Sequence, residues 1–407
     1  MSEWKKVKLG EVTEYITDGD HQPAPKSEQG VYFIKIKDII NNRISFDNAL
    51  HVPSEYYAKL KNNRKAVKGD VLYTVVGSYG TATYVNTELP FCFERNIALL
   101  HANQEINSYF LYLLMSCESF YKKADALANG AAQKLISLKK LQTIEIEIPP
   151  LATQHRIATI LSRYDSLIEN YQKQIKLLEE AAQRLYKEWF IDLHFPGHEN
   201  TNIIDGVPEG WEKKTIDDVT CKITTGLNPR KNFVLGKGSN YYVTIKNMAD
   251  NTLFLDDRCD RVDNEALEKI NKRSDLKIGD ILFSGIGTIG RVALVYIPTN
   301  NWNVSESVFT LRVNDIVTKE FLYLMLLSPD MQNYCQSNAH GAAQKGIRMA
   351  DLKAYSFNLP PFGVIQKFTN LVTPTIKKVS SIRNQIRLLT EARDRLLPRL
   401  MNGEIAV

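Results

Sequence analysis

Two patterns of hydrophobic and polar residues alternate along the chain. Up to about residue 150, short apolar runs such as VYFIKIKDI and TIEIEIPP are separated by Gly, Asn and Asp. Runs of this kind, rich in β-branched residues, are typical of short strands, with a few helices such as one around Tyr109–Phe120. From Leu151 to Phe195 there is no Gly or Pro, and apolar residues recur at spacings of three and four. This second pattern predicts one long helix.

The apolar residues of the predicted helix form a heptad seam, and most residues between them are charged. The seam comprises Leu161, Tyr164, Ile168, Tyr171, Ile175, Leu178, Ala182 and Leu185. A helix of ~40 residues would be ~60 Å long. An amphipathic helix lying on a globular domain is the alternative, but a seam of nearly four heptads favours a partner helix.

A second seam with the same spacing lies near the end of the chain. It comprises Val372, Thr375, Val379, Ile382, Ile386, Leu389, Arg393 and Leu396. Arg393 departs from the apolar pattern, and a charged residue at such a position can set the register or extend its head group to solvent. Pro374 predicts a kink or a late helix start, and Pro398 followed by Gly403 predicts the helix end. We expect the two long helices to pack against each other, antiparallel.

The similarity of the two helices is part of a duplication of the whole chain. The pentapeptide GAAQK occurs at residues 130–134 and again at 341–345, which is 211 positions later. Further matches follow in the same order: Trp4 with Trp211, Gly19 with Gly226, YFIKIKD with YYVTIKN, VKGDVLYTVVGSYG with KIGDILFSGIGTIG, and IPPLATQ with LPPFGVIQ. Each copy has about 200 residues, so the duplicated element is a domain with its helix and not a short repeat.

These patterns define the predicted architecture. The fold class is α+β, with two similar globular domains of mixed strands and helices, separated by two long helices packed as an antiparallel coiled coil. The predicted segments are a first domain at 1–150, a central helix at 151–195, a linker at 196–210, a second domain at 211–361 and a C-terminal helix at 362–407.

Composition and charge restrict the classes of function only weakly. The apolar content is 44% and the formal net charge is +5, which is compatible with a nucleic-acid partner without requiring one. The five cysteines are scattered and form no C-x-x-C pair, so we interpret them as reduced thiols in a cytoplasmic protein. The N-terminus has no apolar signal-peptide core, and no apolar stretch approaches the ~18 residues of a membrane span.

Two motifs suggest cofactor chemistry, and the duplication argues against both. Residues 285–290 read G-x-G-x-x-G after a strand-like run, which is typical of a dinucleotide site. The matching residues 75–80 begin with Val75 in place of the first glycine, so a tight turn is the better interpretation. Asn358-Leu359-Pro360-Pro361-Phe362 differs from the N-P-P-Y/F motif of amino-methyltransferases by an inserted leucine. We find no catalytic pair, no metal-ligand spacing and no cofactor motif, and therefore predict a chain without catalysis, cofactor or metal.

The features that recur in both copies are basic and amide side chains. Each copy has a Gln-Lys after Gly-Ala-Ala, and each has a segment rich in Lys, Arg and Asn, which we predict to be a loop, at Lys59–Lys65 and Lys269–Lys277. These side chains bind phosphates and read base edges. The candidate DNA-binding residues are Lys37, Arg64, Ser78, Tyr79, Gln133 and Lys134 in the first copy, and Lys246, Asn247, Arg273, Thr288, Arg291, Gln344 and Lys345 in the second. For GAAQK itself, a structural turn packed under the domain is the alternative.

The order of these features resembles the specificity (S) subunit of type I restriction–modification systems. Two domains of ~150 residues are each followed by Gly-x-x-Gln-Lys, a Pro-Pro, a Gln and a long helix. The ending RDRLLPRLMNGEI, and EAAQRLYKEWFIDLHFPG followed by VPEGW, are also similar to that family. The resemblance covers essentially the whole chain.

The resemblance implies a function that composition alone does not give. Each domain would be a target recognition domain that reads one half of a bipartite, asymmetric double-stranded DNA site, and the helix pair would fix the gap. The helices would also dock methyltransferase (M) subunits, usually two per chain, which carry S-adenosylmethionine and methylate adenine, and restriction (R) subunits would join for ATP-driven translocation and cleavage. A coiled-coil interaction scaffold with no DNA role is the alternative, and DNA retention that falls steeply with salt would separate the two.

Overall fold

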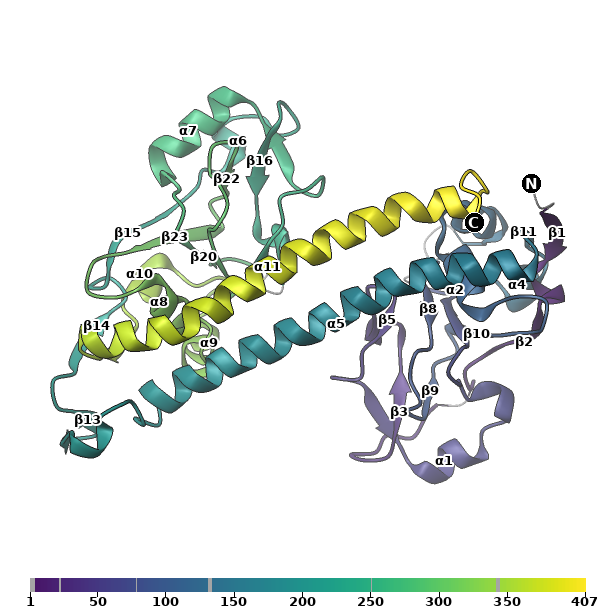
Figure 1. Cartoon of the computed structure of the whole chain (residues 1–407), viewed down its shortest axis with the longest axis horizontal. Coiled ribbons are helices and arrows are strands. Elements are labelled where there is room, and N and C mark those ends of the chain that lie inside the picture. Colours follow the sequence, from purple (N-terminus) through teal and green to yellow (C-terminus); the bar gives the residue numbers. More distant parts are fainter. Residues whose placement is uncertain (1–3, 22, 78, 131–133, 250, 342–344) are drawn as a thin grey trace. The chain divides into compact units, whose positions relative to one another are not determined.

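The computed structural model describes residues 4–21, 23–77, 79–130, 134–249, 251–341 and 345–407. The chain forms two compact units (Figure 1). Unit 1 contains residues Met1–Asn170 and Ile386–Val407, and unit 2 contains Tyr171–Gln385. Each of the two long helices therefore contributes one part to each unit.

Unit 1 is built on two small sheets. The first is antiparallel, in the order β2-β10-β7-β8, and the second has the order β6-β3-β9 with a parallel β3–β9 pair. Its strands are β1 (Lys5–Lys8), β2 (Thr13–Asp18), β3 (Val31–Ile34), β4 (Ile39–Ile40), β5 (Arg43–Ile44), β6 (Leu50–Val52), β7 (Val71–Thr74), β8 (Ala82–Tyr84), β9 (Phe91–Phe93), β10 (Ile97–Ala102) and β11 (Glu145–Ile148). Its short helices are α1 (Ser54–Lys59), α2 (Ser108–Ser116), α3 (Glu118–Leu127) and α4 (Leu138–Gln142).

Unit 2 repeats this topology. Its sheets have the orders β15-β23-β20-β21 and β19-β16-β22, again with one parallel pair, β16–β22. The strands are β12 (Ile203–Ile204), β13 (Val207–Pro208), β14 (Glu212–Thr215), β15 (Thr220–Thr225), β16 (Asn240–Val243), β17 (Met248–Ala249), β18 (Thr252–Leu253), β19 (Asp260–Val262), β20 (Ile281–Ser284), β21 (Val292–Leu294), β22 (Trp302–Val304), β23 (Val308–Val313) and β24 (Ser356–Leu359). The helices are α6 (Pro229–Asn232), α7 (Asn264–Ser274), α8 (Lys319–Leu326), α9 (Pro329–Ser337) and α10 (Met349–Lys353). The predicted fold class and the duplication are confirmed.

A short antiparallel strand pair joins the beginning of each domain to its end. In unit 1, β1 pairs with β11, so that Lys5 lies opposite Ile148. In unit 2, β14 pairs with β24, and Glu212 lies opposite Leu359. Because β11 and β24 directly precede the long helices, each domain begins beside the strand that leads into the helix that follows it.

The repeated glycine that follows the first long strand of each domain has a packing reason. A Cβ built on Gly19 would lie 2.0 Å from the carbonyl oxygen of Phe93, and one built on Gly226 would lie 1.6 Å from that of Val304. Only a residue without a side chain allows the backbone to pass this close to the neighbouring strand.

The long helices are α5 (Leu151–Phe190) and α11 (Phe362–Met401), and they pack antiparallel within each unit (Figure 1). In unit 1, Leu161 of α5 and Leu400 of α11 join one apolar core. In unit 2, Tyr186, Trp189 and Phe190 of α5 pack around Phe368 of α11. Each residue of the predicted seam is buried or half-buried: Leu161, Tyr164, Ile168, Tyr171, Ile175, Leu178, Leu185, Val379, Ile382, Ile386, Leu389 and Leu396.

The helix ends differ from the predicted ones. The helix α11 begins at Phe362, so Pro374 does not delay its start. The Pro374 side chain is exposed, which leaves the backbone carbonyl that loses its hydrogen bond accessible to water. The helix also continues past Pro398 to Met401 before Gly403 takes a positive φ of 76°. The helix α5 ends at Phe190, five residues before the predicted boundary, and Leu193 has a φ of +62°.

The segment Lys269–Lys277 was predicted to be a loop, and that prediction is wrong. Most of it belongs to α7, whose side chains Ala266, Leu267 and Ile270 are buried and whose N-terminus is capped by Asp263. The spacing of these small and apolar residues is helical, and the abundant Lys and Asn residues obscured it. In the described part of the chain, none of the helices is both long and apolar enough to span a membrane.

Candidate nucleic-acid interface

The structure places the two repeated motifs of each domain side by side. We call residues 77–80 and 287–290 the glycine turns, and residues 130–134 and 341–345 the pentapeptide loops. In unit 1, Asn129 and Leu135 flank the pentapeptide loop and exchange two backbone hydrogen bonds of 2.9 Å. The amide of Ile136 then donates to the carbonyl of Val75, just before the glycine turn, at 3.2 Å. The loop is thus closed at its base and held against the strand that leads into the turn.

Unit 2 repeats this arrangement with closer contacts. His340 and Gly346 exchange two backbone hydrogen bonds of 2.8 Å around the pentapeptide loop. The amide of Gly287 donates to the carbonyl of Lys345 at 2.7 Å, and the amide of Ile347 donates to the carbonyl of Gly285 at 2.8 Å. Ile136 and Ile347, which follow the two loops, are both buried and anchor them in the domain core.

Each glycine turn joins two antiparallel strands and does not precede a helix. The first turn lies between β7 and β8, and the second between β20 and β21. The last glycines, Gly80 and Gly290, have φ values of +90° and +89°, which L residues rarely adopt. The G-x-G-x-x-G spacing therefore reflects a tight hairpin turn.

The support beneath the glycine turn differs between the two domains. In unit 1, a Cβ on Gly80 would lie 2.4 Å from the Tyr121 ring, and Tyr79 packs on both Tyr73 and Tyr121. Burial raises the pKa of Tyr79 to about 12, so its hydroxyl is neutral at physiological pH. In unit 2, Gln332 occupies this place and its Nε2 donates to the carbonyl of Gly290 at 3.0 Å. The same turn is thus presented by an aromatic cluster in one domain and by an amide in the other.

The candidate residues of the first domain differ in how freely they reach the surface. Lys37 is exposed on the turn after β3. Lys134 is exposed and forms an ion pair of 2.6 Å with Asp125. Arg64 is largely covered. Its Nη1 donates to Asp20 at 3.2 Å, and its Nη2 lies 3.6 Å from the carboxylate of Asp18. Ser78 and Gln133 lie outside the described residues.

The candidates of the second domain fall into exposed and enclosed groups. Arg273, Thr288 and Lys345 are exposed, and Lys246 is exposed but paired with Asp260 at 3.2 Å. Two others support the backbone. The Asn247 side chain is buried, and its Oδ1 accepts from the Thr244 amide at 2.9 Å. Arg291 donates to the carbonyl of Ile245 at 2.9 Å. Gln344 lies outside the described residues.

A basic surface on α6 and α7 was only partly predicted. Arg230 and Lys231 on α6 are exposed, as are Lys272 and Arg273 on α7. The two helices meet where Lys269 donates to the carbonyl of Asn232 at 2.9 Å. The sequence carried the signal in the run PRKN, but its proximity to α7 depends on the fold.

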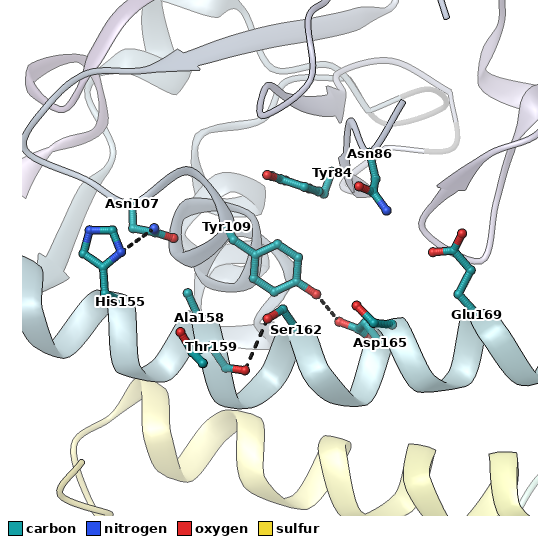
Figure 2. Close-up of a pocket in the computed structure, with 11 residues that line it drawn as sticks. Tyr84, Asn86, Asn107, Tyr109, His155, Ala158, Thr159, Ser162, Asp165 and Glu169 are labelled. Carbon is teal, nitrogen blue, oxygen red and sulfur yellow. Dashed lines mark hydrogen bonds between the residues drawn. The ribbon is translucent and has the colours of Figure 1, made fainter. Parts of the chain in front are cut away.

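A second feature that the sequence did not predict is a pocket of about 330 Å³ in unit 1, between α5 and the domain (Figure 2). Its lining includes Tyr84, Asn107, Tyr109, His155, Asp165 and Glu169. The Tyr109 hydroxyl donates to Asp165. Burial, and then the charge of Asp165, raises the pKa of Tyr109, which keeps the hydroxyl protonated as the donor. Because Arg393 also donates to Asp165, at 2.6 Å, this wall of the pocket joins α2, α5 and α11.

Among the described residues, no group of three or more His, Cys, Asp or Glu side chains is placed to hold a metal ion. What the two domains share is a pair of loops with nearby cations. This arrangement, repeated once per domain on shared helices, is that of a two-domain recognition protein.

Comparisons with known proteins agree with this class. A family model described as the type I restriction modification DNA specificity domain matches residues 1–180 and 208–386. The chain therefore belongs to the family of type I restriction–modification specificity subunits, which are the non-catalytic DNA-recognition components of their complexes.

Individual relatives match along nearly their full length. The MjaIX specificity subunit of Methanocaldococcus jannaschii is 26% identical, and the match covers 99% of this chain and 93% of that protein. The HindI specificity subunit of Haemophilus influenzae is 24% identical, with 100% of both chains covered. The crystal structure of an S subunit from M. genitalium has a TM-score of 0.61 at 18% identity, covers 98% of this chain and 96% of that one, and supports the fold.

Proposed function

We propose that this chain reads a bipartite, asymmetric site on double-stranded DNA, with one half-site per domain. The helices α5 and α11 fix the gap between the half-sites and dock methyltransferase subunits, two per chain. Restriction subunits join this assembly. The chain itself contributes recognition and no catalytic group.

The observation that supports this proposal best is the repeated pairing of glycine turn and pentapeptide loop. In each unit the two motifs begin more than 50 positions apart in the sequence. A backbone hydrogen bond joins turn and loop directly in unit 2, from Gly287 to Lys345, and joins the flanking residues Ile136 and Val75 in unit 1. An exposed lysine, Lys134 or Lys345, ends each loop. Such a pairing with an exposed lysine beside it is suited to reading base edges, with the lysine on a phosphate.

The remaining exposed cations extend this interface. In unit 2, the basic surface of α6 and α7 supplies Arg230, Lys231, Lys272 and Arg273 for phosphate contacts. In unit 1, the corresponding segment at the end of α1 and just after it carries the exposed Lys59 and Lys61. Arg64 and Asn247, which are held by neighbouring groups, would act by supporting their loops.

The decisive experiment is a map of methylated adenines in the host with and without the gene. Loss of one split motif with a fixed gap on deletion would support the proposal and give the target. In an active system, an unchanged methylation map would contradict the proposal. Capture of a methyltransferase partner from the host shows whether the system is assembled.

Two variants refine the test to single domains. Gln133→Ala and Gln344→Ala are each expected to weaken DNA binding, because the amide reads a base edge in this proposal. Lys213→Ala, which removes an exposed cation on β14 that is not a candidate DNA-binding residue, is the control. Unchanged affinity and methylation in both glutamine variants would instead favour a packing role for the loops.

A further inference from the structure

In the described part of each unit, an ion pair links the two long helices. In unit 1, Arg393 of α11 donates to Asp165 of α5 at 2.6 Å, with side chains 27% and 17% exposed. In unit 2, Arg383 of α11 donates to Glu179 of α5, with side chains 17% and 35% exposed. In both pairs the acid lies on α5 and the arginine lies on α11.

The duplication does not account for this division of charge. Since α5 and α11 begin 211 positions apart and both have 40 residues, each position on one has a counterpart on the other. The counterparts of Arg393 and Arg383 on α5 are Ala182 and Gln172, and those of Asp165 and Glu179 on α11 are Ile376 and Thr390. Ala182 and Ile376 are both buried in the core of unit 2, so the place equivalent to the Asp165–Arg393 pair is apolar there.

We propose that these two pairs form a charge code that makes α5 pair with α11 and excludes pairing between like helices of two copies of this chain. In an α5–α5 pair, Asp165 would face Ala182 of the second copy, and Glu179 would face Gln172. In an α11–α11 pair, Arg393 would face Ile376 and Arg383 would face Thr390. Each acid or arginine would lose the opposite charge that the other helix supplies, in a partly buried place, which proteins avoid.

The charges around the seams act in the same direction. Between Val372 and Leu396, α11 has six basic and two acidic residues, whereas α5 has four of each between Leu161 and Leu185. Two α11 helices would therefore repel each other, while α11 and α5 would not. Asp394 also accepts from Arg393, but it lies on the same helix and does not change the pairing preference.

Asp165 is in addition fixed from the domain side. Tyr109 donates to its carboxylate, and Arg43 donates to its backbone carbonyl at 3.4 Å. The acid of the code is thus held in place by contacts that do not involve α11. The consequence is that α5 presents a fixed carboxylate that suits α11 and does not suit a second α5.

Complementary full-length variants test the code. R383E/R393D gives acidic groups on both helices, and D165R/E179R gives basic groups on both. Each variant alone should melt below the wild type. Co-expressed with different tags, they should form a two-chain species that contains one copy of each, in at least roughly tenfold excess over like pairs, as measured by light scattering and tag capture.

Two controls make the result specific. Reversal of both pairs in one chain, D165R/E179R/R383E/R393D, should restore a single-chain species that melts above either double variant. Reversal of the exposed Lys68–Glu88 pair, which lies on neither long helix, should change neither melting nor assembly. Should both double variants aggregate when expressed alone, recovery of the mixed species on co-expression still supports the code.

Formation of only single chains or like pairs on co-expression would overturn the proposal. So would a fourfold variant that is no more stable than the double variants. The assay contains no DNA, so its failure is distinct from failure of the proposed recognition function.

Discussion

Gly226 is a position in the described part of the chain where a single added methyl group should be harmful. A Cβ at Gly226 would lie 1.6 Å from the carbonyl oxygen and 2.5 Å from the carbonyl carbon of Val304. Both atoms belong to the backbone of β22. The next residue, Ser305, is held in place because its backbone amide donates a hydrogen bond of 2.8 Å to the carbonyl of Val243. Reaching an ordinary contact of about 3.4 Å requires the strand to move by about 1.8 Å.

The expected cost of Gly226→Ala follows from this displacement. Overpacking in a fixed core costs about 1–3 kcal/mol, and a backbone clash of this size is at or above the upper end. For a unit of this size, about 3 kcal/mol corresponds to a Tm lower by roughly 6–12 °C. Gly363→Ala is the matched control, since no atom lies within 4 Å of its Cβ and the residue lies in α11. That change should leave the free energy of unfolding unchanged or raise it by at most about 1 kcal/mol.

Tryptophan fluorescence is a suitable assay, because Trp189, Trp211 and Trp302 lie in unit 2 and only Trp4 lies in unit 1. The fluorescence transition of Gly226→Ala should move to lower temperature. Gly19→Ala, with its Cβ 2.0 Å from the carbonyl oxygen of Phe93, should instead destabilise unit 1. If the free energy of unfolding of Gly226→Ala lies within about 1 kcal/mol of that of the wild type, the packing argument for the repeated glycine is wrong.

Three further predictions concern other parts of the chain. The exposed thiol of Cys221 should react with a thiol reagent within minutes at pH 8. Burial raises the pKa of Cys335 to about 12, so this thiol should react only after unfolding, and its rapid reaction in the folded protein would contradict its burial. Lys272→Ala and Arg273→Ala should each lower the slope of log Kd against log salt by up to about one unit for a lost phosphate contact, with unchanged slopes arguing against α7 as a DNA surface. Residues 403–407 include two apolar side chains that pack on the core of unit 1. Their deletion should lower the free energy of unfolding of that unit by about 1–3 kcal/mol. The Trp4 fluorescence transition measures this change, and an unaltered transition would exclude a stabilising role.

The long-range order of the sequence was sufficient to predict the architecture. Apolar residues recur at regular spacing throughout residues 151–190 and 362–401. Because the same pattern occurs in both copies, each copy supports the helix predicted from the other. The glycine turns were predicted for the same reason, since Val75 in one copy excludes a cofactor interpretation of Gly285 in the other. Pro374 misled because the cost of a proline in a helix depends on whether the freed carbonyl is exposed, which the sequence does not state.

The side-chain partners could not be predicted from the sequence. Arg64 resembles a free cation in the run KLKNNRK, yet its acidic partners come from residues more than 40 positions earlier. Asn247 looked like a base reader because of its type, and only its turn shows that its side chain caps the backbone. Arg393 departed from the seam pattern, and its partner Asp165 is 228 positions away on the other helix. Such pairings depend on tertiary contacts between distant segments, which local spacing does not encode.

The strand pairs β1–β11 and β14–β24 have a consequence for the origin of new specificities. Because each domain starts and finishes at adjacent strands, everything between Lys8 and Glu145, or between Thr215 and Ser356, is a cassette with its two ends together. Recombination that replaces the coding segment between such ends would exchange a whole domain while the helices, and whatever docks on them, stay the same. Acquisition of a new specificity would then require two crossovers in the sequence that flanks one domain and no redesign of the helices.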